Sequence, residues 1–142
     1  MLVKEMTFLG IPVAKGRPRL TNWGGIARAY TPAKTKSAEA DVRHQAEVQW
    51  GSEPPLGGPV KVSVTFWMPR PKSYPKKASW DYHVKKPDFD NLAKLLCDSL
   101  NGLCWTDDSQ ICRATISKRY GPAPKTELRI EELELGLTCE LA

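Results

Sequence analysis

Residues 60–68 read Val-Lys-Val-Ser-Val-Thr-Phe-Trp-Met, and this stretch decides the fold class. Apolar side chains at every second position alternate with the intervening Lys, Ser, Thr and Trp. Successive side chains of a strand point to opposite faces of a sheet, so this period of two predicts a strand with one buried face. The chain is therefore expected to build a sheet with one covered side.

Two helices are predicted on either side of this strand. The first follows Thr31-Pro32, which offers an N-cap and a proline at the first helical position, and its apolar face recurs every four residues from Ala38 to Trp50. The second has its apolar face on the leucines between Leu92 and Leu100 and ends at Asn101-Gly102, a typical C-cap and turn. These two helices supply the cover that the sheet needs.

The remaining segments predict further strands. Residues 2–9 favour a first strand, residues 11–25 a loop rich in Pro, Gly and cations, and residues 26–30 a short returning strand. Residues 111–120 and 127–135 flank a Gly-Pro-Ala-Pro-Lys turn and are interpreted as an antiparallel hairpin. The sequence thus predicts one α+β domain over residues 1–142, with a mixed sheet and two main helices.

Composition excludes several classes of protein. The chain has 142 residues and contains no apolar run near the roughly 18–20 residues of a membrane span. The apolar stretch at residues 8–14 is broken by Pro12 and leads into a basic run, unlike a secretory signal. Four cysteines without a Cys-x-x-Cys pair are expected to be reduced thiols. We therefore expect a cytoplasmic protein that makes no use of a membrane.

Charge is distributed unevenly along the chain. The formal net charge is +5, but residues 1–36 and residues 61–86 each hold seven basic residues and one acidic residue. Residues 87–110 instead carry a net charge of −4. Concentrated basic segments beside an acidic one favour a polyanionic partner such as a nucleic acid.

The acidic residues form two blocks, at residues 86–92 and 105–110. Proline disfavours a helical conformation for the residue before it, so the chain is expected to reach Asp88 in an extended form. In an extended segment Asp88 and Asp90 point to the same side, and Asp90 is placed to cap a helix beginning at Asn91. Lys94 follows one turn later and can reach the same space.

The second block holds Asp107 and Asp108, which lie beyond a helix about 16 Å long. Either these residues sit on a strand that runs back under the helix, or another chain completes the site. Carboxylate oxygens suit Mg²⁺ or Mn²⁺, whereas zinc favours His or Cys, which the two blocks lack. Such ions next to a phosphodiester can activate water for hydrolysis.

The two blocks also resemble the signature of a known family. The segments Lys86–Lys94, Asp98–Gly102 and Trp105–Ile111 are similar to motifs of the RusA-type Holliday-junction resolvases. The basic run Gly10–Arg19 resembles the entry motif of that family, and Tyr30-Thr31-Pro32 its entry into the first helix. The resemblance covers most of the chain.

This resemblance implies a small homodimeric, metal-dependent endonuclease of bacteria or their phages that makes paired nicks in four-way DNA junctions. It implies that Asp88, Asp90 and Asp108 are the catalytic carboxylates that bind Mg²⁺, that Asp107 is their acidic neighbour in the metal site, and that Lys94 is a functional lysine. Asp98 matches the pattern as well, and we expect it to pair with Lys94. The expected processes are DNA recombination and repair.

Two other functions stay open. One is a nuclease for other branched or flapped DNA, and the other is a non-catalytic DNA-binding protein whose acidic cluster holds a structural cation. In each case the basic segments are expected to contact phosphates. The predicted DNA-binding residues are Lys15, Arg17, Arg19, Arg70, Lys72, Lys76, Lys77, Lys85 and Lys86.

Overall fold

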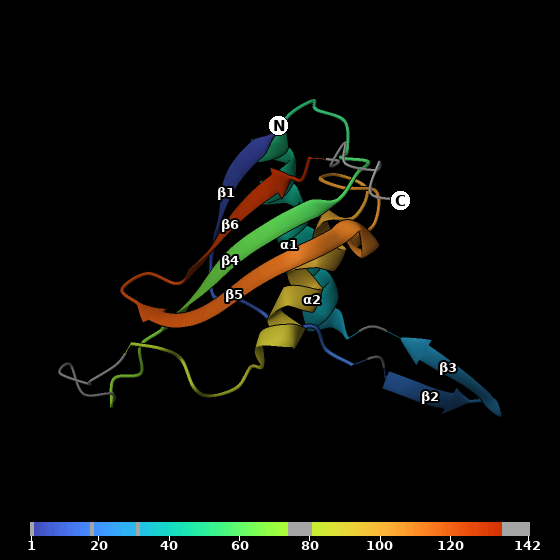
Figure 1. Cartoon of the computed structure of the whole chain (residues 1–142). Coiled ribbons are helices and arrows are strands. Elements are labelled where there is room, and N and C mark those ends of the chain that lie inside the picture. The colour runs from blue at the N-terminus through green and yellow to red at the C-terminus, as the bar shows by residue number, and fades with distance from the viewer. Residues whose placement is uncertain (1, 18, 31, 74–80, 135–142) are drawn as a thin grey trace, which may run out of the picture.

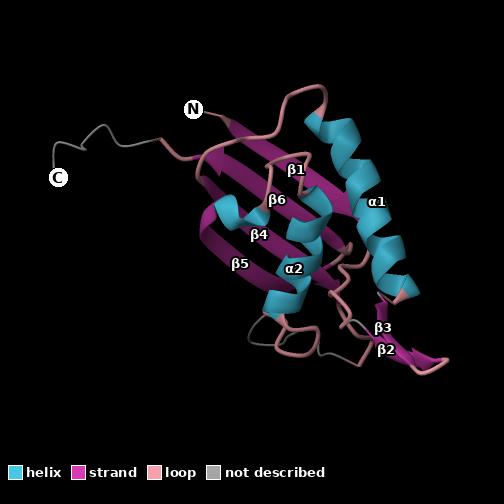
Figure 2. Cartoon of the chain, turned by 90° about the vertical axis from the view of Figure 1, so that its right-hand side faces the viewer, coloured by secondary structure: helices cyan, strands magenta, loops and turns pink. Residues whose placement is uncertain are grey.

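The computed structural model describes residues 2–17, 19–30, 32–73 and 81–134. A four-stranded sheet forms one layer, and two helices form the other (Figures 1 and 2). In chain order the elements are β1 (Val3–Leu9), β2 (Arg19–Trp23), β3 (Ile26–Tyr30), α1 (Ala33–Trp50), β4 (Val60–Pro69), α2 (Phe89–Leu100), the 3₁₀ turn η1 (Asp108–Gln110), β5 (Ile111–Gly121) and β6 (Lys125–Glu132).

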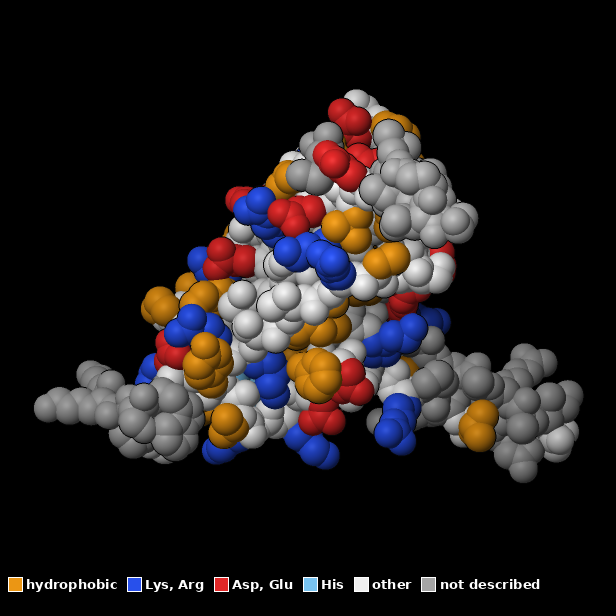
Figure 3. Space-filling view, viewed as in Figure 1, with side chains coloured by type: hydrophobic (Ala, Val, Ile, Leu, Met, Phe, Trp, Pro, Cys, Tyr) orange, Lys and Arg blue, Asp and Glu red, His pale blue; other side chains and the backbone are white. Residues whose placement is uncertain are grey.

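The predicted alternation of the strand at residues 60–68 is confirmed in β4. Its five inward-facing side chains, from Val60 to Met68, are at most 6% exposed. Both helices pack on this face of the sheet, and the opposite face is open in Figure 3. The core lies between the two layers and includes Trp50, Leu92, Leu100 and Trp105, all at most 1% exposed. The predicted α+β class, with a mixed main sheet and two main helices, is thus confirmed.

The predicted hairpin of the last two strands is wrong in its pairing. The sheet order is β1-β6-β4-β5, so β4 lies between β5 and β6. β5 pairs with β4 in parallel, and β6 pairs with β4 in an antiparallel arrangement. Because β4 has the most regular apolar face, its best burial is at the centre of the sheet, where strands cover both of its edges.

The predicted loop at residues 11–25 is also wrong in part. Arg19–Trp23 forms strand β2, which pairs with β3 and projects from the body as a two-stranded arm (Figure 1). Gly24 and Gly25 form the turn, with φ of +62° and +80°. A two-residue hairpin turn with two positive φ angles favours glycine at both positions, so this glycine pair was the available signal.

The first helix begins at Ala33, with Pro32 at the N-cap position, whereas the predicted cap, Thr31, lies outside the described residues. No helix in the described ranges is long and apolar enough to span a membrane. The thiols of Cys97, Cys104 and Cys112 are free, as expected, and Cys139 is not among the described residues.

Candidate active site

The segment that leads into α2 is held along the outer edge of β5. The amide of His83 donates to the carbonyl of Lys118 at 3.0 Å, and the amide of Tyr120 donates to the carbonyl of Asp81 at 2.7 Å. Tyr82 pairs with Arg119 as an isolated antiparallel bridge. These bonds fix the path of the chain before the first acidic block.

Lys118 fixes the last residues of that path. Its Nζ donates to the carbonyl oxygens of Lys85 and Pro87, each at 2.7 Å. Pro87 immediately precedes Asp88, so one ammonium group on β5 holds the backbone next to the candidate carboxylate. The sequence did not reveal this role, because a lysine on a strand gives no signal of contact with a distant loop.

His83 lies in the same segment and is 8% exposed. Its ring meets the ring of Tyr120 edge to face, with the centroids 5.1 Å apart. Burial lowers the pKa of His83, and the positive charges of Lys118 and Lys85 lower it further. The imidazole is therefore neutral at pH 7. It packs against Tyr120 of β5 and so helps to hold the segment that precedes Asp88.

Asp88 is extended, as predicted, but the predicted helix start and the capping role of Asp90 are wrong. Helix α2 begins at Phe89 rather than at Asn91, so Asp88 is the N-cap residue and Asp90 lies inside the first turn. Asp88 has an extended conformation, with φ −72° and ψ 150°, but its side chain makes no capping bond. Asp90 Oδ1 accepts a hydrogen bond from the amide of Asn91 at 3.0 Å. Two exposed carboxylates thus lie at the positive end of the helix dipole.

Asp107 and Asp108 precede β5 instead of lying on it. Asp107 caps η1: its Oδ2 accepts from the amide of Ser109 at 3.1 Å, and its own amide donates to Gln110 Oε1 at 2.9 Å. The hydrogen bonds from Ser109 lower the pKa of Asp107, with a smaller effect from the charge of Lys94. β5 then runs back beside α2 and reaches the N-terminus of that helix at Lys118. The returning strand is therefore present, but Asp107 and Asp108 lie just before it.

Asp108 lies beside the middle of α2. It is half-buried, and its charge acts on Cys97, which follows Lys94 on the helix. Burial raises the pKa of Cys97 to about 12, with further contributions from the carboxylates of Asp108 and Asp98. The carboxylates of the two blocks therefore border the same helix, at its first turn and along its side.

Lys94 lies between these carboxylates. Its Nζ is 3.2 Å from Asp98 Oδ1, which confirms the expected pair, and 57% of its side chain is exposed. Asp98 also receives Lys15 Nζ at 3.2 Å. One carboxylate thus holds two ammonium groups, of which Lys94 is the more accessible to a ligand.

Lys15, a predicted DNA contact, is half-buried and paired. Its Nζ lies 3.0 Å from Glu39 Oε1 on α1 as well as near Asp98 on α2. Burial by itself lowers the pKa of Lys15, but the two carboxylates outweigh it and raise the pKa above 10.5. The backbone amide of Lys15 donates to the carbonyl of Asn91 at 2.9 Å. Lys15 therefore joins the loop at residues 10–17 (the entry loop) to both helices. A DNA contact by this residue stays a prediction.

The structure describes only some of the other predicted DNA-binding residues. Arg17, Arg70, Lys72, Lys85 and Lys86 are exposed. The Arg70 guanidinium lies 5.8 Å from the centre of the Tyr120 ring. Lys76 and Lys77 lie outside the described residues, as does the side chain of Arg19 on β2. In Figure 3, acidic and basic side chains lie close together near the lower end of α2.

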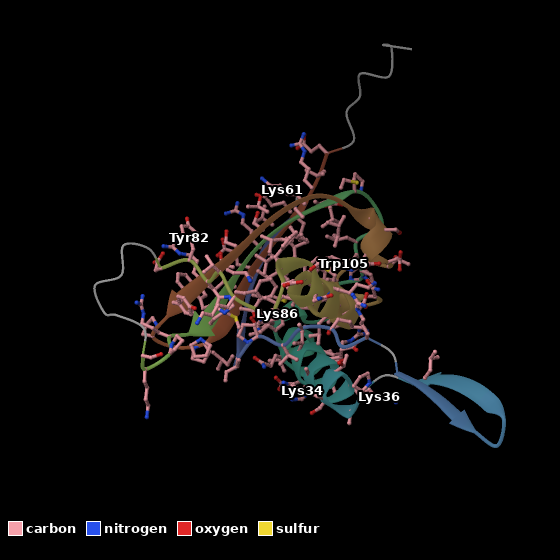
Figure 4. All side chains as sticks on the ribbon, turned by 90° about the horizontal axis from the view of Figure 1, so that it is seen from below. Lys34, Lys36, Lys61, Tyr82, Lys86 and Trp105 are labelled. Atoms are coloured by element: carbon pink, nitrogen blue, oxygen red, sulfur yellow. The ribbon has the colours of Figure 1, made fainter. Side chains whose placement is uncertain are left out.

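Two further lysines, Lys34 and Lys36, lie in the first turn of α1. They were not among the predicted DNA-binding residues. That turn holds no acidic residue, although the positive end of a helix dipole disfavours cations. Seen from below, both lysines project from α1, and Lys86 lies beside α2 (Figure 4). A Thr-Pro helix start followed by lysines instead of acids was the signal that could have found them.

The donor set fits a hard divalent ion by its chemistry, since the side chains that border α2 are carboxylates. Within residues 2–17, 19–30, 32–73 and 81–134, no three His, Cys, Asp or Glu side chains converge on one point. Asp88 and Asp90 lie at the N-terminal end of α2 and Asp108 lies beside the helix, so among the described residues these carboxylates do not form a preassembled site.

Comparison with known proteins identifies the family. The family model described as "Endodeoxyribonuclease RusA" matches residues 10–131. The "Uncharacterized protein YqaN" of Bacillus subtilis (strain 168) is 34% identical over 137 residues, covering 91% of this chain and 96% of that protein. The "Crossover junction endodeoxyribonuclease rusA" of Lactococcus phage r1t is 36% identical over 76 residues, covering 53% of this chain and 56% of the phage protein. The two acidic blocks and the helix between them all lie within the matched residues, and the chain belongs to the RusA endodeoxyribonuclease family.

Proposed function

We propose that this protein is a Mg²⁺-dependent endodeoxyribonuclease that resolves four-way DNA junctions by paired symmetric nicks, in the recombination or repair of bacterial or phage DNA. The observation that carries the proposal is the match of the RusA family model to residues 10–131, which contain both acidic blocks. The name of the phage relative supports the same substrate class. The expected site of action is the cytoplasm.

Asp88, Asp90 and Asp108 would hold the metal, with Asp107 beside them; Mn²⁺ takes the same oxygen ligands. A bound divalent ion supplies the activation of water and the stabilisation of charge on the phosphate. The exposed Nζ of Lys94, positioned by Asp98 at 3.2 Å, presents a positive charge to the developing phosphorane. Lys118 holds the backbone of Pro87 and thereby positions Asp88.

The exposed cations would bind the DNA backbone around these residues. Arg17 precedes β2, Lys85 and Lys86 precede Asp88, and Arg70 and Lys72 follow β4. Contacts of this kind fix the register of DNA without reading its sequence, and their affinity falls with rising salt. Lys34 and Lys36 extend this basic surface onto α1.

We further propose a homodimer, because a four-way junction has two-fold symmetry and needs two coordinated cuts. The outer edge of β5 at residues 112–115, away from the stretch that residues 81–83 cover, is the surface that supports it. β5 ends the sheet, and residues 112–115 are exposed on both of its faces. Inward-facing Ala114, which pairs in register with Val62, is exposed although Val62 is buried. An Ala114→Arg variant is expected to sediment as a monomer, whereas the wild type sediments as a dimer; a monomeric wild type would contradict this proposal.

The enzyme proposal is tested with a synthetic four-way junction and a linear duplex of the same arm sequence, each incubated with Mg²⁺ or with EDTA. We expect paired nicks only in the junction and only with Mg²⁺. Asp90→Asn and Asp108→Asn are expected to bind the junction without cutting it. Asp41→Asn, a carboxylate that accepts a hydrogen bond from Gln45 on α1, is the matched control and is expected to cut normally.

Each alternative gives a different result. An intact junction under every condition would support a DNA-binding protein with a structural cation. Faster cutting of a flap or a three-way branch would support a nuclease for other branched DNA. Equal cutting of the linear duplex would reject selectivity for structure.

A further inference from the structure

A hollow of about 830 Å³ lies between the entry loop, the start of α1 and the residue before Asp88. Its apolar lining includes Pro12, Val13 and Met68, and its lining also includes the cations Arg17 and Lys34. Pockets that enclose small organic ligands have volumes of roughly 300–1,000 Å³ and are mostly apolar, with a few polar groups that fix orientation. The hollow therefore suits a ligand that combines an apolar part with negative charge.

The walls of this hollow are fixed to the candidate carboxylates. Pro87 forms part of the wall and immediately precedes Asp88. On the other side, the amide of Lys15 donates to the carbonyl of Asn91 at 2.9 Å, directly after Asp90. A ligand that contacts Asp88 and Asp90 therefore has the hollow as its immediate neighbour.

The entry loop is pressed closely against α1 at the same place. The amide of Gly16 donates to Thr35 Oγ1 at 3.0 Å, and Thr35 is 2% exposed. A Cβ at residue 16 would lie 2.7 Å from that oxygen, closer than side-chain atoms approach without a shift of their neighbours. The hollow thus has a preformed wall of backbone.

Positive charge surrounds the opening. Arg17 and Lys34 are exposed, and Lys34 lies in the first turn of α1, where the helix dipole adds to its charge and no acidic residue offsets it. Lys36 lies in the same turn. A phosphate group at the opening would relieve this accumulation of positive charge.

We propose that the hollow receives the base of an unpaired nucleotide next to the scissile phosphate, with its phosphate held by Arg17 and Lys34. This inference rests on the proposed nuclease function. A base in a linear duplex must be unpaired and unstacked before it can enter a pocket, whereas a base at a branch point has lost part of that stacking. Binding in the hollow therefore favours branched DNA over duplex DNA at the site of cutting.

The test uses a four-way junction with 2-aminopurine at the point of strand exchange, bound in EDTA so that the strand stays intact. Fluorescence is expected to increase on binding, because the base leaves its stack and the described lining carries no aromatic ring to quench it. A junction with an abasic residue at that position is expected to bind roughly tenfold more weakly, because it loses the burial of the base against the apolar lining.

Two variants separate the hollow from the rest of the surface. Ile11 lines the hollow and is 59% exposed, so Ile11→Asp places a negative charge there without disturbing the core. This variant is expected to lose the fluorescence increase and to bind the junction roughly tenfold more weakly, because the charge opposes burial of the base in the hollow. Val48→Asp, at a site on α1 that is 74% exposed, is the matched control and is expected to behave as wild type.

The outcomes distinguish this inference from the proposed function. Paired nicks in the junction, with no fluorescence increase and no effect of the abasic residue, would overturn the inference and leave the nuclease intact. A fluorescence increase that Ile11→Asp abolishes, in a protein that cuts no branched DNA, would support the hollow and overturn the nuclease. Equal losses for Ile11→Asp and Val48→Asp would also overturn the inference.

Discussion

The two acidic blocks differ in how far the fold uses their carboxylates. In the block after α2, Asp107 accepts a bond from Ser109 and completes a reciprocal cap with Gln110. In the block before α2, Asp88 is the N-cap residue but makes no side-chain capping bond. An N-cap aspartate normally satisfies an amide of the first turn. Asp107 thus has a structural task, whereas Asp88 is held in place by its neighbours and is available to a ligand.

The largest effect is expected at Asp88. Asp88→Asn should lower junction cleavage more than about 100-fold, because loss of groups that only support a metal ligand already costs roughly 10–100-fold. Its melting temperature should stay close to that of wild type, since the side chain makes no capping bond. Single-turnover cleavage and calorimetry measure the two quantities. A large loss of stability with retained cleavage would reverse the proposed difference between the blocks.

The next effect concerns the support of Asp88. Lys118→Met removes the donor to the carbonyls of Lys85 and Pro87 and should lower cleavage roughly 10–100-fold, with little loss of junction binding. Lys125→Met, which removes a surface ion pair with Glu127 at 3.8 Å, is the control and should cut normally. Restoration of cleavage by higher Mg²⁺ would support a role in positioning the metal ligands. Equal losses in cutting and binding would instead identify Lys118 as a DNA contact.

A smaller effect on stability is expected at Lys15. Lys15→Met leaves Glu39 and Asp98 without a shared cation and should lower the free energy of unfolding by about 1–2 kcal/mol. The pKa of Lys15 is raised in the folded protein, so its contribution is complete below its unfolded pKa and is lost as the pH rises through the folded pKa. Urea titrations at pH 8 and above pH 11 should show the difference between wild type and variant shrinking. A constant difference would indicate lost packing instead of lost charge.

The smallest effect is expected at Asp107. Its pKa is lowered by hydrogen bonds from Ser109, so the carboxylate stabilises the fold above its unfolded pKa of 3.8, and this stabilisation is lost as the pH falls through the folded pKa. Asp107→Ala should slightly lower the melting temperature at pH 7, and the difference should vanish in acid. Scanning calorimetry between pH 7 and pH 2 measures both curves. A difference that persists at pH 2 would contradict a role for the charged side chain.

Local patterns predicted the elements well wherever the signal was periodic or had a turn residue. The strand at residues 60–68 and the leucine face of α2 were found because both bury one face. The start of α2 was placed two residues late, since Asp90 was assigned the capping position that Asp88 occupies. A direct pairing of β5 with β6 was predicted wrongly, because neighbours in sequence were assumed to be neighbours in the sheet, whereas both strands pair with β4.

The sequence suggested the residues of the candidate site but not the residues that hold them in place. Asp88, Asp90, Lys94 and Asp108 stand out because charged residues concentrate in two short segments. Lys118 gave no such signal, because its partners are carbonyl groups about thirty residues away in the chain. Lys15 was predicted to contact DNA, and only the structure shows that Glu39 and Asp98 reach it from two different helices.

By itself, the sequence determined the class of the domain and the family to which it belongs, because side-chain periodicity and local motifs are written in consecutive residues; the carboxylate chemistry stays a prediction from the same motifs. Only the tertiary structure decided which charges are paired and which are free. It also decided that the entry loop, α1 and Pro87 enclose a hollow beside Asp88. Ion pairs and cavities depend on contacts between distant segments, and those contacts are set by the packing of the helices on the sheet.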